Sequence, residues 1–280
     1  MDRRDMTLYT RDTIAAATSK GNQEKWYDPA SGCWYKADAF GYEALAEAAA
    51  STLLLRHSNI VSAHGIPVVE YAIKRATLHG RPHILSASKN FLCAGESIVT
   101  VHRLLSTAMP DYQQGLCRAR TLPGKIRLLV NAVEAATGLD GFGQYLTLLF
   151  ELDTLILNTD RHLNNIAVLR VNGRFRYCPI FDNGAAFLLG ENGGSFDIET
   201  PVLIRTAEAL PFRVSFARLA GAARKLYGPQ LKVSFTKGEI EQFLLPLAAQ
   251  YPPSLQPYLT DRVKIVLLQQ KKRFFEGAGL

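Results

Sequence analysis

The stretch LILNTDRHLNNIAVLR, residues 155–170, is the part of the sequence that decides its fold and its chemistry. Aliphatic side chains on both sides enclose a polar cluster that starts at Asp160 and contains Asn165 five residues later. The cluster is too polar for a strand in a core and too short for a solvated helix. It therefore predicts a loop at the end of a buried helix and just before a hairpin.

The hairpin that follows this loop presents a second acidic residue. Asn172-Gly173 predicts a tight turn between strands in residues 165–173 and 174–184, because this dipeptide accepts the positive φ angles of short hairpin turns. The second strand ends in FDNG, which contains Asp182. Two aspartates and one asparagine are thus expected at loop positions of one compact helix–hairpin unit.

Phosphoryl transfer is the chemistry that needs such a set of side chains. One carboxylate must face the attacking hydroxyl and accept its proton, while a second carboxylate and an amide oxygen hold Mg²⁺ against nucleotide phosphates. The spacing lets Asp160 reach an acceptor hydroxyl while Asn165 turns back toward the metal. Asp182 is expected to approach the metal from the next strand.

The same residues also have purely structural interpretations. Asp160 could only cap the end of the preceding helix, and Asp182 before Asn-Gly fits ordinary turn chemistry. Asn164 lies beside Asn165 but has the less suitable spacing. Arg161 is expected to pair with a local carboxylate or carbonyl oxygen.

Composition narrows the class of protein. The chain has 280 residues, 48% of them hydrophobic and 20% charged, which is typical of one large or two small globular domains. The net charge of +7 favours anionic partners. The basic residues are scattered, however, and no aromatic–basic stripe for single-stranded nucleic acid is present. Composition therefore does not indicate direct binding of nucleic acid.

The sequence predicts a cytoplasmic protein that does not enter a membrane. The four cysteines have no CxxC or zinc-finger spacing, which is typical of ordinary thiols in a reducing compartment. The N-terminal residues MDRRDMTLYTRDT lack the apolar segment of a secretory signal. The most apolar run, residues 145–157, is too short and too charged to span a bilayer.

Hydrophobic periodicity predicts a small α+β unit in residues 1–94 and a larger, mostly helical unit in residues 95–280. The first unit reads as strand, strand, helix, strand, strand. Its hairpin is expected in residues 18–38, its helix in 41–58 and its second pair of strands in 66–88. The second unit is expected to begin as helix near residue 95 and to contain a buried central helix in 141–159. Its other helices are expected in residues 124–137, 212–227, 238–249 and 258–275. A ligand cleft is expected between the two units.

Seven motifs in this order resemble the HipA-like serine/threonine kinases, and most of all the short CtkA-type members that lack an extra N-terminal subdomain. The motifs are GNQEKW, YKAD, GYEALAE, SKNFL, NTDRHLNN, PIFDNG and LPFRVSF. DRHLNN alone also resembles the catalytic loop of phosphatidylinositol kinases, and the D-x-x-x-x-N spacing occurs in aminoglycoside kinases. The resemblance implies a two-lobed protein-kinase-like fold, with ATP and Mg²⁺ as cofactors.

The resemblance also implies roles for individual residues. By position, Asp160 is the catalytic aspartate, and Asn165 and Asp182 are the metal ligands. Lys36, on a strand, is expected to contact the α- and β-phosphates. A lysine on a half-buried strand also needs a partner of opposite charge.

Further nucleotide contacts follow from the resemblance. Glu43 or Glu47 could orient the lysine, and since they lie four residues apart on one helix face, both alternatives stay open. Backbone N–H groups near Gly21 and Asn22 could hold phosphate oxygens. No G-x-G-x-x-G loop of the eukaryotic kinase kind is present, so this other phosphate clamp is required.

The interlobe hinge is expected in residues 84–92, which include Ser88, where backbone groups would meet adenine. In long HipA-like members, a serine three residues before the glycine of the phosphate loop becomes autophosphorylated. The corresponding residue here is Thr18, with Ser19 beside it.

The resulting prediction is a kinase that transfers the γ-phosphate of ATP to a serine or threonine of an unidentified protein. A small antitoxin-like protein, or one that replaces the missing N-terminal subdomain, is an expected partner by family resemblance. The same resemblance implies nucleic acid only indirectly, through such a partner. The alternatives are a small-molecule or lipid kinase that uses the same site, and a nucleotide-binding pseudokinase that sequesters a partner.

Overall fold

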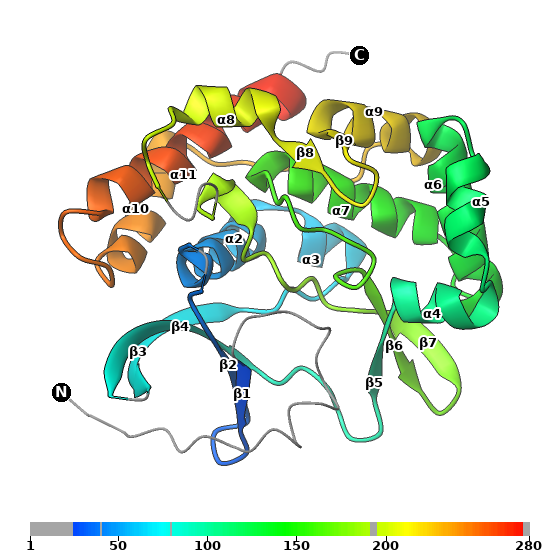
Figure 1. Cartoon of the computed structure of the whole chain (residues 1–280), viewed down its shortest axis with the longest axis horizontal. Helices are drawn as coiled ribbons and strands as arrows, with labels where there is room; N and C mark the ends of the chain where they lie inside the picture. The colour runs from blue at the N-terminus through cyan, green and yellow to red at the C-terminus, as the bar shows by residue number, and fades with distance from the viewer. Residues whose placement is uncertain (1–24, 40, 79, 191–194, 277–280) are drawn as a thin grey trace.

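The computed structural model places a small β-rich part beneath a larger layer of helices (Figure 1). The structure describes residues 25–39, 41–78, 80–190 and 195–276 of the chain. The arrangement confirms the predicted α+β class, with a small sheet near the N-terminus and helices in most of the rest.

A four-stranded antiparallel sheet forms the first β-rich part. Its strands, in spatial order, are β1 (Lys25–Asp28), β2 (Cys33–Ala37), β4 (Arg81–Lys89) and β3 (Tyr71–Leu78). The Asp28 carboxylate closes the first hairpin, because it accepts a hydrogen bond from the backbone N–H of Ala30 at 3.0 Å. In the register of this hairpin Lys25 lies opposite Lys36, so both lysines belong to one face of the sheet.

Helix α2 (Glu43–His57) connects this sheet to the helical part. Its sequence EALAEAAASTLLL is rich in good helix formers, and ten of its residues are buried. The helix packs on β3 and β4 and also on α10 (Lys237–Ala248). Because it is covered on several sides, α2 shares the main hydrophobic core with the C-terminal helices.

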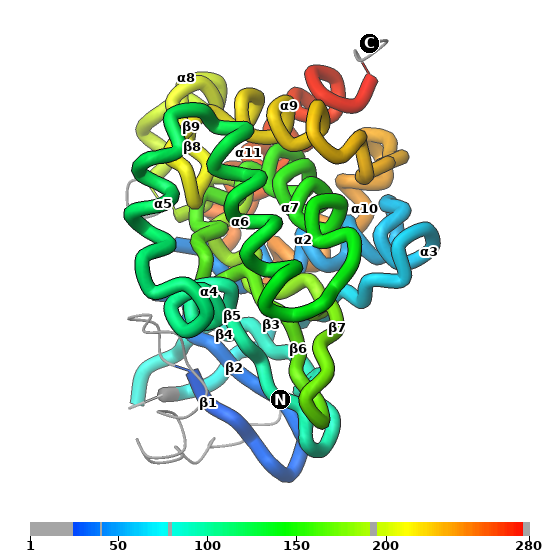
Figure 2. The backbone as a smooth tube through the Cα atoms, turned by 90° about the vertical axis from the view of Figure 1, so that its right-hand side faces the viewer, coloured from blue at the N-terminus to red at the C-terminus, as the bar shows by residue number. Residues whose placement is uncertain are grey.

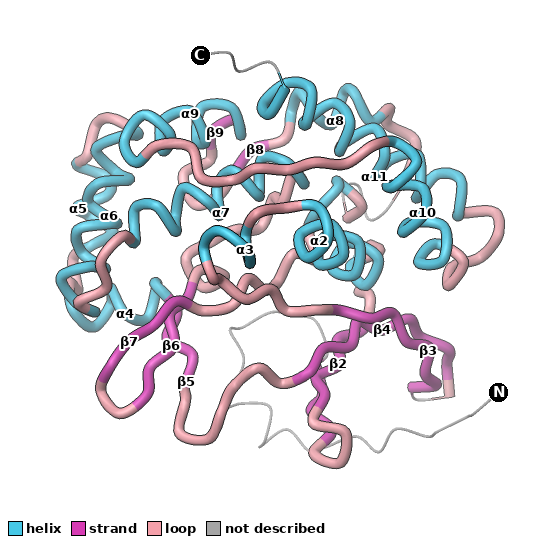
Figure 3. The backbone as a smooth tube through the Cα atoms, turned by 180° about the vertical axis from the view of Figure 1, so that it is seen from behind, coloured by secondary structure: helices cyan, strands magenta, loops and turns pink. Residues whose placement is uncertain are grey.

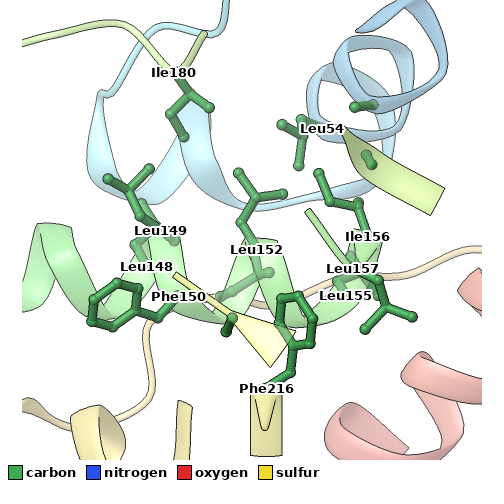
Figure 4. Packing of buried hydrophobic residues seen from close by; sticks show 14 of the residues in the cluster. Leu54, Leu148, Leu149, Phe150, Leu152, Leu155, Ile156, Leu157, Ile180 and Phe216 are labelled. Atoms are coloured by element: carbon green, nitrogen blue, oxygen red, sulfur yellow. The ribbon is translucent and has the colours of Figure 1, made fainter. Parts of the chain in front are cut away.

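Helix α7 (Phe142–Ile156) is the buried central helix that the sequence predicts. Only Gln144 of its residues is exposed. Its aliphatic side chains pack against Leu54 of α2, Ile180 and Phe216 of α9 (Phe216–Tyr227) in the centre of the core (Figure 4). The helix ends at Leu157, which takes a left-handed φ of 49°.

A second sheet differs from the sequence prediction. The expected hairpin forms from β6 (Ala167–Val171) and β7 (Arg174–Tyr177), but β5 (Ser97–Thr100) adds to it as a third strand, in a region predicted to be helical. Helix α4 (Val101–Ala108) begins only after Thr100, whose hydroxyl caps it by accepting from the N–H of Arg103. Seen from behind, the two sheets lie side by side under the helices (Figure 3).

The remaining helices cover the core from the other sides. Helices α4, α5 and α6 form one side face of the molecule (Figure 2). The bounds of the remaining elements are α3 (Ile60–His64), α5 (Tyr112–Arg118), α6 (Leu122–Thr137), α8 (Thr200–Thr206), β8 (Glu208–Ala209), β9 (Val214–Ser215) and α11 (Gln256–Lys271). Of these, α3, α5, α8 and the β8–β9 pair were not predicted.

One large core extends through both parts of the chain. It joins α2 to the central helix α7 and to the C-terminal helices α10 and α11. The predicted division after residue 94 falls in the loop between β4 and β5. Within the described residues, no helix has the length and apolar character needed to cross a membrane.

Candidate active site

The loop that follows α7 folds into consecutive tight turns. The backbone N–H of His162 donates to the carbonyl of Asp160 at 2.8 Å, and that of Asn165 donates to the carbonyl of His162 at 2.8 Å. Helix α4 supports the loop from outside, because the N–H of His102 donates to the carbonyl of Leu163 at 3.0 Å. Backbone bonds therefore give this loop a defined shape and fix the positions of Asp160 and Asn165 within it.

Asp160 and Asn165 of this loop face different environments. The side chain of Asp160 is 54% exposed, whereas Asn165 is 6% exposed. The Nδ2 of Asn165 donates to the Asp160 carbonyl at 2.9 Å, which orients its amide oxygen away from that carbonyl. An open carboxylate thus lies beside a fixed amide.

Lys36, Glu47 and Asp182 meet at the junction of the two parts. The Nζ of Lys36, on β2, lies 2.7 Å from Glu47 Oε1 and 2.7 Å from Asp182 Oδ1. Glu47 comes from α2 and is fully buried, and Asp182 follows the second hairpin. The Lys36 ion pair is therefore formed with Glu47, whereas Glu43 accepts from the backbone N–H of Ala39 at 3.2 Å.

The segment that carries Asp182 is fixed from both parts of the chain. Glu47 Oε2 accepts from the N–H of Asn183 at 2.8 Å, and the Tyr71 hydroxyl accepts from the N–H of Asp182 at 3.3 Å. Ile180 forms a parallel bridge with Val68, just before β3. These contacts hold Asp182 at a φ of 59°, in the left-handed region that non-glycine residues rarely adopt.

The pKa values of Asp182 and Asp160 are shifted in opposite directions. Burial alone would raise the pKa of Asp182, but the charges of Lys36 and Lys25 outweigh it and hold that pKa well below its ordinary value. The pKa of Asp160 is raised by partial burial and by the Asp182 charge, against a lowering effect of His162. The Asp182 carboxylate is thus firmly ionised, while that of Asp160 has a higher affinity for protons.

Lys36 and its other carboxylate partner, Glu47, also have shifted pKa values. Burial favours neutral Lys36, but the Asp182 and Glu47 carboxylates reverse this effect and hold the pKa of Lys36 well above its ordinary value. Burial raises the pKa of Glu47, although the Lys36 charge opposes the shift. The lysine is therefore a permanent cation in the site.

The sequence reasoning missed Lys25. Burial and the Lys36 charge lower the pKa of this residue, while the charges of Asp182, Glu47 and Asp160 raise it, so Lys25 interacts electrostatically with the site. A usable signal was present, since Lys25 and Lys36 stand opposite each other across the hairpin turn. Like charges directly opposite are unfavourable unless an anion lies between them.

Other predicted residues lie outside this cluster or outside the described part of the chain. Ser88 is in β4, opposite Trp34 on one side and Tyr71 on the other. Of the predicted hinge, residues 84–89 belong to β4 itself and only residues 90–92 lie in the loop that follows, because the strand continues to Lys89.

The predicted phosphate loop and autophosphorylation positions fall outside the described residues. These positions are Gly21, Asn22, Thr18 and Ser19.

The donor set fits Mg²⁺. Asn165 and Asp182 would supply an amide oxygen and a carboxylate, which are the hard oxygen ligands that this ion prefers. In the described ranges no three His, Cys, Asp or Glu side chains converge into a metal cluster. Mg²⁺ takes only one or two protein carboxylates and completes its shell with phosphates and water.

Comparisons with known proteins agree with a kinase-like architecture. No protein-family model and no curated protein sequence matches the chain. Among solved structures it is similar to the proinflammatory kinase CtkA of Helicobacter pylori, with a TM-score of 0.58 and 14% identity, covering 91% of this chain and 89% of that one.

The chain is also similar to a complex of HipA, HipB and operator DNA from the toxin–antitoxin system of Shewanella oneidensis. That match has a TM-score of 0.46 and 12% identity, and it covers 92% of this chain and 65% of the other. The fold is therefore that of a CtkA-like kinase, as the sequence motifs predict.

Proposed function

We propose that this chain is an ATP- and Mg²⁺-dependent serine/threonine protein kinase of the HipA-like type. One observation carries the proposal, which is the meeting of Lys36 with Glu47 and Asp182 beside the loop of Asp160 and Asn165. A lysine cation, an ionised carboxylate, a fixed amide and an open carboxylate are the parts that phosphoryl transfer requires.

Asp160 would act on the acceptor. Its side chain is more than half exposed, so a hydroxyl can approach it. Its raised pKa makes it a better proton acceptor than an ordinary aspartate. It would orient a serine or threonine hydroxyl toward the γ-phosphate and take the proton of that hydroxyl.

The other residues would hold the nucleotide. Lys36 would contact the α- and β-phosphates, and Lys25 adds a second positive charge on the same face of the hairpin. Asn165 and Asp182 would hold Mg²⁺, which neutralises phosphate charge when bound. Glu47 would keep Lys36 in place. Catalysis would then consist mainly of positioning and electrostatic stabilisation.

The acceptor defines the competing proposals. A small-molecule or lipid kinase would use the same residues with a different acceptor, and a pseudokinase would bind ATP without transfer. Autophosphorylation at Thr18 or Ser19 and binding of a small antitoxin-like partner remain predictions from the sequence resemblance.

The test is incubation of the purified protein with Mg²⁺ and γ-labelled ATP, alone and with candidate proteins, sugars and lipids, followed by mass spectrometry. Label on serine or threonine supports the proposal and locates the site. Label only on a sugar or lipid would replace the protein kinase with a small-molecule or lipid kinase. Nucleotide binding without transfer to any acceptor would favour the pseudokinase.

A further inference from the structure

Arg161 makes more contacts than a local ion pair requires. Its side chain is 1% exposed. Nε and Nη2 each donate to the Asp153 carboxylate at 3.0 Å. Nη1 donates to the carbonyls of Asn165 at 3.1 Å and Phe181 at 3.0 Å, and Nη2 also donates to Asn183 Oδ1 at 2.6 Å. All three nitrogens of the guanidinium are therefore used.

These acceptors come from three separate segments. Asp153 belongs to the central helix α7, and Asn165 closes the loop that contains Asp160. Phe181 and Asn183 are the two neighbours of Asp182 in the chain. A single planar group thus joins the rigid core helix to both of the segments that carry the proposed Mg²⁺ ligands.

We infer that Arg161 is a positioning residue that fixes the separation and orientation of the two Mg²⁺ ligands, Asn165 and Asp182. This inference rests on the proposed function. Arg161 holds the main chain of the first ligand directly, and it holds the second by the residues on either side. Asp182 needs this support because its left-handed backbone is unfavourable for a residue with a Cβ atom.

The geometry requires arginine rather than any cation. The guanidinium is a rigid fork that can donate in several directions at once within its plane. A lysine ammonium at the same position could still pair with Asp153, but it could not reach all the acceptors that Arg161 reaches. Arg161→Lys therefore separates charge compensation from positioning.

A second buried ion pair on the same helix supplies a matched control. Glu151, also on α7 and fully buried, pairs with Arg224 of α9. Glu151 also accepts from the N–H groups of Gln230 at 2.9 Å and Leu231 at 2.7 Å, and Arg224 donates to the carbonyl of Phe274. These contacts join α7 to α9 and to the short π-helical segment Lys272–Glu276, and they involve neither loop of the site.

The experiment compares three variants with the wild type. They are Arg161→Lys, the double variant Asp153→Asn/Arg161→Met, and the control double variant Glu151→Gln/Arg224→Met. Changing both partners avoids leaving an uncompensated charge in the core, which could prevent folding. For each protein one measures the thermal midpoint, the affinity for a fluorescent ATP analogue with Mg²⁺ and with EDTA, and kcat for phosphoryl transfer.

Mg²⁺ raises nucleotide affinity relative to EDTA, and we expect this increase to be smaller by a factor of about ten or more in both Arg161 variants than in the wild type. Residues that support metal ligands have effects of this size. The affinity of the Arg161 variants in EDTA should stay unchanged, because Lys36 keeps Glu47 as its partner. Their kcat should fall by about 100-fold, the effect of a small misplacement. The control should lose stability and keep the Mg²⁺-dependent gain.

The inference is overturned if the Arg161 variants keep the full gain from Mg²⁺, or if the control loses as much of it as they do. Failure of the proposed kinase function would give a different result. In that case the wild type would bind ATP with Mg²⁺ but transfer no phosphate, and the affinity comparison would still decide the role of Arg161. A wild type that gains no affinity from Mg²⁺ would overturn both proposals.

Discussion

At the scale of single residues, Asp182 is held in the candidate site by contacts of its carboxylate and of the backbone around it. Its carboxylate is bonded to Lys36, its N–H is bonded to Tyr71, and the next residue is bonded to Glu47. Each of these partners comes from the N-terminal part of the chain, more than 100 residues away in sequence. The site is thus assembled by tertiary contacts and not by the FDNG segment alone.

Replacing Glu47 should test this assembly. Glu47→Gln removes a buried charge partner of Lys36, and we expect nucleotide affinity to fall by about 10- to 100-fold, the usual effect of losing a hydrogen bond to a charged group. Glu43→Gln, one turn earlier on the same helix, is the matched control and should bind nucleotide nearly as the wild type does. Titration with ATP analogues measures both, and equal losses would contradict the assignment.

The sequence indicated most of the residues in this cluster but not their pairing. Asp160, Asn165 and Asp182 follow from motif spacing, and Lys36 follows from the resemblance to HipA-like kinases. The choice between Glu43 and Glu47 stayed open, because both occupy one helix face and only the packing of α2 against the core decides which one faces the lysine.

At the scale of elements, the start of α2 is stabilised by Asp38, shortly before the helix, and by Tyr251, far from it in the sequence. Its N-cap residue, Tyr42, makes no side-chain capping bond. Instead Asp38 accepts from the N–H of Ala44 at 2.7 Å, and the hydroxyl of Tyr251 accepts from the N–H of Leu45 at 3.2 Å while donating to Asp38 at 2.9 Å. Two of the free N–H groups of the first helical turn, those of Ala44 and Leu45, are thereby satisfied.

This cap predicts a pH dependence of stability. Burial raises the pKa of Asp38 from 3.8 to about 7, an effect to which the Glu43 charge adds, while the bonds from Ala44 and Tyr251 oppose it. Between these values the folded protein keeps a proton that the unfolded chain has lost. The contribution of Asp38 is therefore full below pH 4 and is lost as the pH rises through about 7.

Urea denaturation between pH 4 and 8 measures this contribution, which is at most about 4 kcal/mol. Asp38→Asn should flatten the decrease in the free energy of unfolding over this interval. Glu70→Gln, at an exposed position just before β3, is the control. It should leave the decrease in the free energy of unfolding as it is in the wild type. An unchanged pH profile in Asp38→Asn would contradict the assignment.

Local hydrophobic periodicity was sufficient to predict the helices and strands whose sequence patterns are strong. The hairpins, α2, α6, α7 and the C-terminal helices form where alternation or helical spacing predicts them. Strand β5 was missed because its partner β6 lies about 70 residues later, so no local signal reports the pairing. Helices α5 and α8 were missed because each has only seven residues.

At the scale of the whole molecule, the main hydrophobic core is much larger than the separate cluster to which β1 and β2 contribute. The separate cluster beneath β1 and β2 consists of three buried residues, Trp26, Ala37 and Leu85. The main core extends from α2 to α11. We therefore expect β1 and β2 to open more easily than the helices.

Both tryptophans of the chain, Trp26 and Trp34, lie in β1 and β2, so their fluorescence reports on these strands alone. During denaturation it should change at a lower denaturant concentration than far-ultraviolet circular dichroism, which reports mainly on the helices. ATP with Mg²⁺ should bring the two transitions together. Coincident transitions without ligand would show that the sheet and helices unfold as one unit.

The most direct test of the central claim is transfer of labelled γ-phosphate by the wild type, by Asp160→Asn and by Asp182→Asn, all with Mg²⁺. Asp140→Asn, at an exposed position after α6, serves as the control. We predict label on serine or threonine with the wild type and the control, and turnover roughly 10²–10⁴-fold lower in the two site variants, which should remain folded. Wild-type turnover in either site variant would contradict the assignment of that aspartate.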